Sequence, residues 1–569
     1  MKASVVAVLL LTFAFGHAGC FTTQPGERYY GRVVVPKAQH FRWSDGGLPQ
    51  IFDPAFAATP PDTDLVRAIF EGLTDYDPRT LTPVPAVASR WESSDGDRTW
   101  TFYLREDARW SDGQSVTAHD FVRSWERVAK IGDLVPHTEL LRNIQGARNA
   151  LRQLQANRNE RSAAPPKAAI KSVVEPQFGA QALSDKILRV HLERADENFP
   201  ALVAHPVFRP VRTAEIEPGK RIGSAAIISN GAFTLSATEP DRVVLKRAEN
   251  YWAKSEVALN VVEFVGAVDE EAALAAYRAG TIDAVTNASF EPLAIKLLAP
   301  YEDFRRETYG ALTYYSFNTA RAPFDDVRVR EALAIAIDRE RISEDELGGS
   351  TEPAKRFLPD EMDDKTDTVV GSRQLLEKNV ARARKLLAEA GFPDGNGFPR
   401  VRLLINRNEQ QRVVSQSIAA MWHAELNIET DIIMRNWDEY EAVVRAGEYD
   451  VVRRGLVMQT TDELTNIRLL FQHERQNFAG SQQPLATAER QSDSEAQALS
   501  ELKSIPIYFA SSYSLVKPYV NGFDANVLDI PSLRSVSIDT NWKTHDIAQG
   551  SGPSLVIHEA PSAVRATAF

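Results

Sequence analysis

The feature that most constrains the fold lies at the start of the chain, in the residues MKASVVAVLLLTFAFGHAGC. One basic residue, Lys2, precedes an apolar run from Val5 to Phe15, and small residues then lead to Cys20. This layout is typical of a secretory signal peptide, and the run is too short to span a bilayer. Residues 1–20 are therefore predicted to direct export, so that the rest of the chain folds outside the cytoplasm.

Cys20 is the only cysteine, which excludes an internal disulfide, a thiolate zinc site and a dithiol redox motif. The ending HAGC resembles a bacterial lipobox, although His17 stands where an aliphatic residue is usual. We expect Cys20 to be lipidated and to anchor the protein to a membrane, in the periplasm or cell envelope. The alternative is an ordinary signal peptide that happens to end in a cysteine.

The acidic balance of the chain limits its partners. The formal net charge is -12 and the pI about 5.5, so the chain would repel nucleic-acid phosphates and no nucleic-acid partner is expected. Hydrophobic residues make up 43% of the 569 residues, which is enough for an extended core. Beyond Cys20 no apolar run reaches the length of a membrane span, so a body tethered at most by its anchor is expected.

Enzyme signatures are missing from the sequence. It has no Walker loop, no GxGxxG dinucleotide fingerprint, no GxSxG nucleophile turn and no HExxH zinc helix. The near matches GNGFPR (395–400) and HEAPS (558–562) lack the third glycine and the second histidine. We therefore expect no enzyme activity, no metal and no cofactor.

Strand and helix patterns alternate along the chain, which favours an α/β fold. A strand is predicted at 99–105 and helices at 118–128, 329–338 and 380–391. Residues 149–185 are polar and interrupted by proline, and are predicted to form a surface insertion, while 551–569 are expected to be a frayed tail.

Two local patterns have a physical interpretation. In WSDG the turn residues are expected to let Trp110 pack beneath a hairpin, and Asp120 is expected near a helix N-terminus. In APFDDVRVREAL, Val327 is expected on the buried face of a helix and Arg330 on its outer face.

Six blocks resemble, in order and spacing, the extracytoplasmic oligopeptide- and dipeptide-binding proteins of peptide ABC importers (solute-binding protein family 5). The densest is RWSDGQSVTAHDFVRSWERV, residues 109–128. The others are SNGAFTL with KRAENYW (229–252), AYRAGTIDA (276–284), YYSFNTARAPFDDVRVREALAIAIDRE (314–340), ARKLLAEAGF (383–392) and IPIYFASSYSLVKPYVNGF (505–523). The resemblance covers about residues 48 to 540.

The resemblance implies a two-lobed, type II periplasmic binding protein-like α/β fold with crossing hinge strands and an extra domain. It assigns lobe I to 21–70, 197–284 and 510–550, the added domain to 71–196, and lobe II to 285–509. It also implies that a short peptide is bound between the lobes and passed to the permease subunits of an ABC importer. We expect a monomer.

The ligand strand of the family corresponds to YDVVRRGLVMQTTDELTNIRLLF, residues 449–471. Family members hold the ligand carboxylate with an arginine and its amine with an aspartate. In this chain Arg453 and Gly455 match, Leu456 replaces an aromatic residue, Gln459 stands at the aspartate position, and Asp462 follows three residues later. The ligand-binding residues predicted from the resemblance are Arg453, Gly455, Leu456, Val457, Gln459, Asp462 and Tyr508.

Several alternatives remain at this point. Arg453 is as well suited to an internal salt bridge as to a ligand carboxylate. Asp462 either replaces the missing amine anchor or caps the helix predicted at ELTNIRLLF. The scaffold also suits a non-peptide solute, or an envelope interaction or chaperone-like role for an altered cleft.

Overall fold

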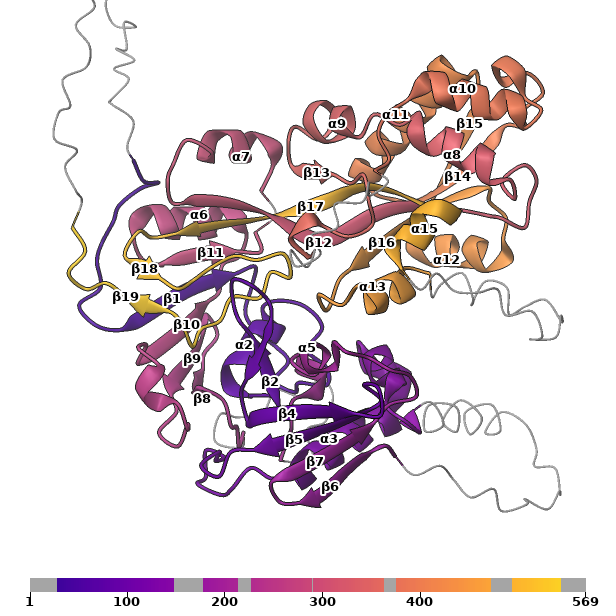
Figure 1. Ribbon diagram of the computed structural model, residues 1–569. Helices are drawn as coiled ribbons and strands as arrows, with labels where there is room; N and C mark the ends of the chain where they lie inside the picture. The colour runs from indigo at the N-terminus through magenta and orange to yellow at the C-terminus, as the bar shows by residue number, and fades with distance from the viewer. Residues whose placement is uncertain are drawn as a thin grey trace, which may run out of the picture.

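The computed structural model describes residues 28–147, 178–212, 227–288, 290–362, 375–471 and 494–543. Figure 1 shows two α/β bodies joined by a pair of long strands, with a third, smaller body below them. We call the body around β1 and β8–β11 lobe I and the body around β14–β16 lobe II. The predicted α/β class, with two lobes and crossing strands, is confirmed.

One mixed, eleven-stranded sheet runs through both lobes in the order β15-β14-β16-β12-β17-β11-β1-β10-β9-β8, with β13 paired to β17. The lobe I strands are β1 (His40–Asp45), β8 (Phe233–Thr238), β9 (Arg242–Arg247), β10 (Val261–Val265) and β11 (Ala284–Thr286). The lobe II strands are β13 (Thr351–Pro353), β14 (Val401–Asn406), β15 (Thr430–Arg435) and β16 (Val451–Val457).

Two long antiparallel strands, β12 (Phe304–Phe317) and β17 (Ser504–Val516), belong to both lobes. Their register shifts between Thr308 and Leu312, so residues 309–311 of β12 are the crossing point. There the N–H of Gly310 donates to the carbonyl of Val527 (2.7 Å), a contact outside the β12–β17 ladder. The ladder shifts register again between Thr313 and Tyr314, and the longer break at 309–311 is the natural position of a hinge between the lobes.

Helices cover the sheet in each lobe. Lobe I has α2 (Asp62–Ile69), α6 (Glu270–Ala279) and α7 (Pro292–Leu298). Lobe II has α8 (Val327–Ile335), α9 (Arg339–Arg341), α10 (Val380–Glu389), α11 (Glu409–Leu426), α12 (Trp437–Ala446), α13 (Glu463–Leu470) and α15 (Glu495–Glu501). Several begin at Asp, Asn or Ser residues whose side chains accept from the third amide of the helix, as at Asp269, Asn379 and Asn408.

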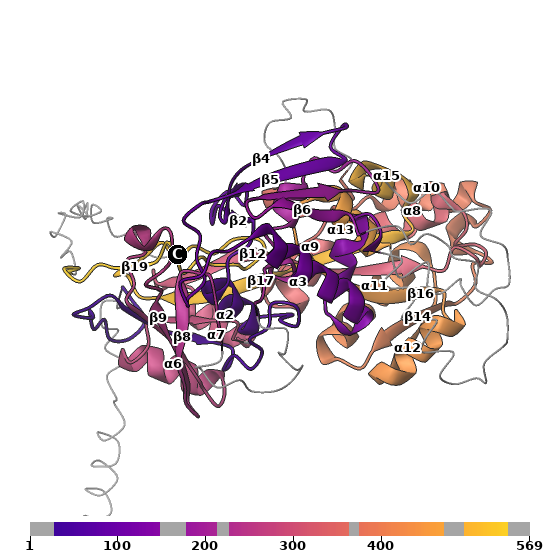
Figure 2. The same cartoon turned by 90° about the horizontal axis from the view of Figure 1, so that it is seen from below.

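The smaller body has a four-stranded sheet in the order β4-β5-β7-β6. Its elements are β4 (Ala88–Ser94), β5 (Thr99–Leu104), α3 (Ala118–Ile131), β6 (Ala180–Ser184), β7 (Ile187–His191) and α5 (Phe199–Leu202). Short pairs β2 (Thr74–Tyr76) with β3 (Pro83–Pro85), and β18 (Val520–Asn521) with β19 (Ser537–Ile538), complete the strands. In Figure 1 this body lies below α2 and α13, and Figure 2 shows its sheet and α3 from below.

The smaller body shares its core with lobe I, whereas lobe II has a second core, to which Ala201 of α5 also contributes. Trp43 and Phe264 of lobe I belong to the same buried cluster as Trp125 of α3. The lobe II cluster contains Leu312, Trp422 and other residues from the helices around β14–β16. The protein therefore has two principal hydrophobic cores, and the hinge strands connect them.

The predicted strand at 99–105 and helix at 118–128 are confirmed, with Trp110 almost fully buried. Asp120 is the third residue of α3 and forms a capping box with Thr117. The surface insertion predicted over 149–185 is wrong at its end, where residues 180–184 form the edge strand β6. The strand forms by main-chain pairing with β7, and polar side chains do not prevent such pairing. Residues 149–177 and the tail 551–569 lie outside the described residues.

The predicted orientation of Arg330 on α8 was wrong. Its side chain is 6% exposed and donates to the carbonyl oxygens of Phe324, Asp325, Glu501 and Leu502, whereas Val327, expected to be buried, is 40% exposed. Helix α8 begins at Val327, with Asp326 as its cap, so Val327 and Arg328 face solvent while Val329 and Arg330 turn inward. A guanidinium supplies five donors, and here it satisfies the carbonyl groups at the end of α15.

Candidate functional site

Strand β16 has a neighbour along its whole length on one side only. It pairs with β12 from Val451 to Val457, but its pairing with β14 stops at Val452. In an open α/β sheet ligands bind beyond the carboxyl ends of the parallel strands, and β16 extends beyond β14 at that end. The last part of β16 is therefore an open edge of the lobe II sheet, and we call residues 453–457 the free edge.

The direction of the main-chain groups along the free edge follows from two hydrogen bonds. The N–H of Met458 donates to Gly310 O (2.8 Å), and the N–H of Asn318 donates to Asp450 O (2.9 Å). Because main-chain groups alternate along an antiparallel pair, those of Gly455 and Val457 point away from β12. Among the described residues, the N–H groups of Gly455 and Val457 and the carbonyl of Gly455 have no strand to pair with.

Arg453 is the first residue of the free edge, and its side chain lies on the same face of the sheet as Gly455. Its Nη2 donates to Thr313 Oγ1 on β12 (3.3 Å), and its Nε is buried without an acceptor. The guanidinium lies over Gly455, where an added Cβ would be 3.3 Å from Nη2. In the described part of the chain no carboxylate pairs with Arg453, so the internal salt bridge considered from the sequence is not found there.

Gln459 follows the free edge and meets a residue from the other side of the hinge. Its Oε1 accepts from His205 Nε2 (3.1 Å), and its Nε2 donates to Val457 O (3.1 Å). His205 precedes a short turn of 3-10 helix at Pro206–Phe208 and is 5% exposed. Burial, and then the neighbouring His137, hold the pKa of His205 well below its usual value.

Asp462 caps a helix, as one of the two sequence hypotheses stated. It is the N-cap of α13, where one carboxylate oxygen accepts from the N–H of Thr465 (2.6 Å) and the other from Asn198 Nδ2 (2.8 Å). Asp196 lies close by, and burial together with the charge of Asp462 raises its pKa to about 7. This region is thus a contact between α13 and the segment that precedes α5.

The other predicted residues lie at different depths. Leu456 packs against the lobe II core, Val457 is 43% exposed, and Tyr508 is buried. The Tyr508 hydroxyl accepts from Gln411 Nε2 (2.8 Å) and Gln410 Nε2 (3.2 Å) of α11. Tyr508 lies on β17, the second strand from β16 in the sheet. The structure thus brings Arg453, Gly455, Val457 and Gln459 together and leaves Tyr508 as a support for the face on which Thr313 lies.

Several residues of this candidate site do not stand out in the sequence. Thr313 and Tyr315 of β12 pair with Gly455 and Arg453, and the Tyr440 hydroxyl donates to Arg453 O. The hydroxyl of Tyr315 is buried without a partner. Alternation along 312–317 indicates which residues of β12 share a face, but only the register shows that they share it with Arg453.

Three buried carboxyl groups, those of Asp45, Asp64 and Asp529, gather near the hinge crossing. Asp529 accepts from Ser512 Oγ on β17 (2.8 Å), and neither oxygen of Asp64 has a donor. Burial raises the pKa of all three, to about 6 for Asp529, and the charge of Asp45 raises that of Asp64 further. A proton on either Asp45 or Asp64 would let the two groups form a hydrogen bond.

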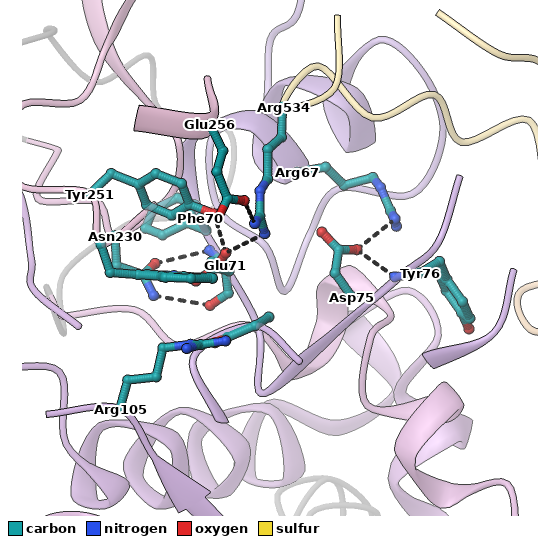
Figure 3. A network of polar contacts seen from close by, with 12 residues as sticks. Arg67, Phe70, Glu71, Asp75, Tyr76, Arg105, Asn230, Tyr251, Glu256 and Arg534 are labelled. Atoms are coloured by element: carbon teal, nitrogen blue, oxygen red, sulfur yellow. Dashed lines mark hydrogen bonds and ion pairs between the residues drawn. The ribbon is translucent and has the colours of Figure 1, made fainter. Parts of the chain in front are cut away.

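Glu71 is another buried carboxylate, but its contacts are structural. Its side chain accepts from Tyr251 Oη and from Trp252 Nε1 (2.7 Å), and its main chain exchanges two hydrogen bonds with Asn230. Arg534 approaches Glu71 at 3.9 Å (Figure 3). Burial raises the Glu71 pKa to about 7 in spite of these donors. The network joins the segment after α2 to the segments that precede β8 and follow β9, and to the C-terminal segment of lobe I.

The described part of the chain contains neither a metal-binding cluster nor a candidate membrane-spanning helix. No group of three or more His, Cys, Asp or Glu residues there is arranged to hold a metal ion. No helix among the same residues is long and apolar enough for a membrane span. Cys20 lies outside the described residues.

Residues 82–478 match the model of the family described as bacterial extracellular solute-binding proteins, family 5 middle region. The chain is 30% identical over 499 residues to the periplasmic murein peptide-binding protein MppA of Escherichia coli (strain K12), with 84% of this chain and 89% of that protein covered. It is 29% identical over 500 residues to the periplasmic oligopeptide-binding protein OppA of Salmonella typhimurium (strain LT2), with 84% and 89% covered.

The fold is similar to a solved structure described as the periplasmic murein tripeptide binding protein MppA in its unliganded open form. The TM-score is 0.72 at 27% identity, and the match covers 89% of this chain and 98% of that chain.

Proposed function

The chain belongs to family 5 of the bacterial extracellular solute-binding proteins, and on that premise we propose that it captures short peptides outside the cytoplasm and delivers them to an ABC importer. The free edge of β16, with Arg453 beside it, is the observation that carries this proposal. The protein acts as a receptor and changes no bond of its ligand.

The free edge binds an extended peptide by strand addition. The open main-chain groups of Gly455 and Val457 alternate with residues that pair to β12, so a peptide alongside them would continue the sheet. Each such hydrogen bond contributes about 0.5–1.5 kcal/mol net. Because every peptide has the same main-chain donors and acceptors, this mode tolerates many side chains.

Arg453 binds the carboxylate of the peptide. Its guanidinium has one contact to a neutral hydroxyl and a buried Nε without an acceptor, so a carboxylate would satisfy donors that the described residues leave open. The absence of a side chain at Gly455 leaves room for the guanidinium over the strand.

The same proposal includes the setting of the receptor. Cys20 becomes the lipidated first residue of a periplasmic or envelope protein, the body is a monomer, and the permease subunits of the importer are its protein partners. Apart from α5 and α7, which lie in the smaller body and in lobe I, the proposed lobe and domain boundaries are those expected from the sequence. Because one acyl chain holds a protein only marginally, stable anchoring requires more than one.

Replacement of Cys20 with Ser should abolish fatty-acid labelling and release the protein from membranes, and unchanged membrane association would exclude the anchor.

Calorimetry with synthetic tri- and tetrapeptides tests the function. The unmodified protein should bind them, and Arg453→Ala should weaken binding by about 1.5–3 kcal/mol with little change in melting temperature. Arg445→Ala, an exposed arginine on α12, is the matched control and should leave affinity unchanged. A large loss of stability with unchanged affinity would assign Arg453 to the scaffold.

Mass spectrometry of ligand retained on purification separates the alternatives. A copurified peptide supports the proposal, and a copurified non-peptide solute would replace it with a receptor for another ligand. If no peptide binds and none is retained, an envelope interaction role would take its place.

A further inference from the structure

The two ends of the free edge differ in charge. At one end is the guanidinium of Arg453, with no carboxylate partner among the described residues. At the other end, beyond Val457, are Gln459 and His205, both uncharged groups. A ligand lying along the edge thus meets a cation at one end and a neutral pair at the other.

The orientation of the Gln459–His205 pair is determined by its neighbours. The N–H of Val207 donates to His205 Nδ1 (3.1 Å), so the proton of the neutral ring is on Nε2 and is donated to Gln459 Oε1. The amide nitrogen of Gln459 donates to Val457 O. A flipped amide would place two donors together at His205 and two acceptors together at Val457. The acceptor of Gln459 is therefore already in use.

The carboxylates near this end are also in use. Asp462 is 6% exposed, and its two oxygens accept from Asn198 and from the first turn of α13. A carboxylate oxygen of Asp196 accepts from the N–H of Asn198 (3.0 Å). The charge of Asp462 raises the pKa of Asp196, and the charge of Arg468 lowers it. In the described part of the chain, the contacts at Gln459 itself thus include no carboxylate.

We propose that this receptor selects peptides with a free carboxylate and an uncharged amino end, such as N-acylated peptides, through the neutral pair of Gln459 and His205. An ammonium that packs against this pair would lose water without gaining a carboxylate, which is costly. An acyl carbonyl is neutral and accepts the second hydrogen of Gln459 Nε2, since only one is used for Val457. This inference rests on the proposed peptide-binding function and names its ligand class.

Calorimetry on a matched pair, Ala-Ala-Ala and its N-acetyl form, tests the inference. The unmodified protein should bind the acetylated peptide about tenfold more tightly, as expected when one charged group is left without its partner. Gln459→Glu keeps the shape of the side chain and adds a charge, so it should reverse the preference toward the free amine. Gln416→Glu adds the same charge at an exposed position of α11 and should leave the ratio unchanged.

The outcomes separate this inference from the function on which it rests. If the unmodified protein binds the free-amine peptide as tightly as the acetylated one, or more tightly, the inference is overturned while peptide binding stands. The same conclusion follows if Gln459→Glu folds normally and leaves the ratio unchanged. If neither peptide binds at millimolar concentration, the peptide-binding function itself fails. The comparison on the unmodified protein decides the matter even where the variant does not fold.

Discussion

Residues 109–128 and residues 449–462 differ in how far their polar groups are hydrogen-bonded within the protein. In the first segment Trp110 Nε1, Thr117 and Arg123 all donate to the carboxylate of Asp120, so its polar groups satisfy one another. In the second segment the Nε of Arg453 is buried without an acceptor, and the main-chain groups of Gly455 face no described strand. The first segment resembles the family most densely and is scaffold, whereas the second departs from the family pattern and contains the proposed ligand-binding residues.

The difference shows that the segment most easily recognised in the sequence need not be the segment that binds the ligand. A segment whose groups satisfy one another depends on a particular set of residues for stability, so it is readily identified. A binding segment must leave groups open for a partner, and its residues vary with that partner. Substitutions in the first segment should therefore affect stability, and substitutions in the second should affect affinity.

The largest expected effect is on the stability of the scaffold segment. Trp125 is fully buried in α3, and its Nε1 donates to Phe208 O (2.7 Å). Trp125→Ala should lower the free energy of unfolding by about 3–5 kcal/mol, because it leaves a cavity and an unpaired carbonyl. Trp437→Ala on α12 is the control, since that side chain is 59% exposed. Urea unfolding measures both, and an equal loss in the two variants would contradict the comparison.

A smaller effect on stability is expected from the cluster of Asp45, Asp64 and Asp529 near the hinge, where buried groups of the scaffold lack hydrogen-bond partners. Burial raises the pKa of Asp529 to about 6, so the folded state binds its proton more tightly than the unfolded state does. The favourable contribution of this protonation to folding stability is complete below the unfolded pKa near 3.8, and it is lost as the pH rises through about 6.

Asp529→Asn should therefore stabilise the protein at pH 7.5, by about 1–3 kcal/mol, and have little effect at pH 4. Melting curves at the two pH values measure the effect. Asp524→Asn, a half-buried position in the same loop, is the control. Equal stabilisation by Asp529→Asn at both pH values would show that the gain does not come from titration.

The smallest effect is expected at the free edge. Gly455→Ala would place a Cβ 3.3 Å from Arg453 Nη2 and displace the guanidinium. We expect peptide affinity to fall by roughly 1 kcal/mol, or about fivefold, with no loss of melting temperature because the position is exposed. Gly47→Ala, where an added Cβ meets nothing within 4 Å, is the matched control. Unchanged affinity in calorimetry would mean that the guanidinium position does not matter to the ligand.

Much of the fold and part of the site could be predicted from sequence. The strand at β5, the helix α3 and the cap at Asp462 follow from periodicity and from hydrogen bonds over three or four residues. The outward orientation predicted for Arg330 failed because its acceptors include carbonyl oxygens of Glu501 and Leu502, far along the chain. Local pattern contains no information about such distant partners.

The sequence by itself predicted the export segment, the family, the α/β class and the candidate residues on one strand. Each of these depends on residues that are close together in the chain. Only the tertiary structure decided that β14 ends early beside β16 and that Gln459 meets His205, 254 residues away. Strand register and hinge geometry set these contacts. A shift of one residue in register would turn each main-chain group of the free edge to the other side.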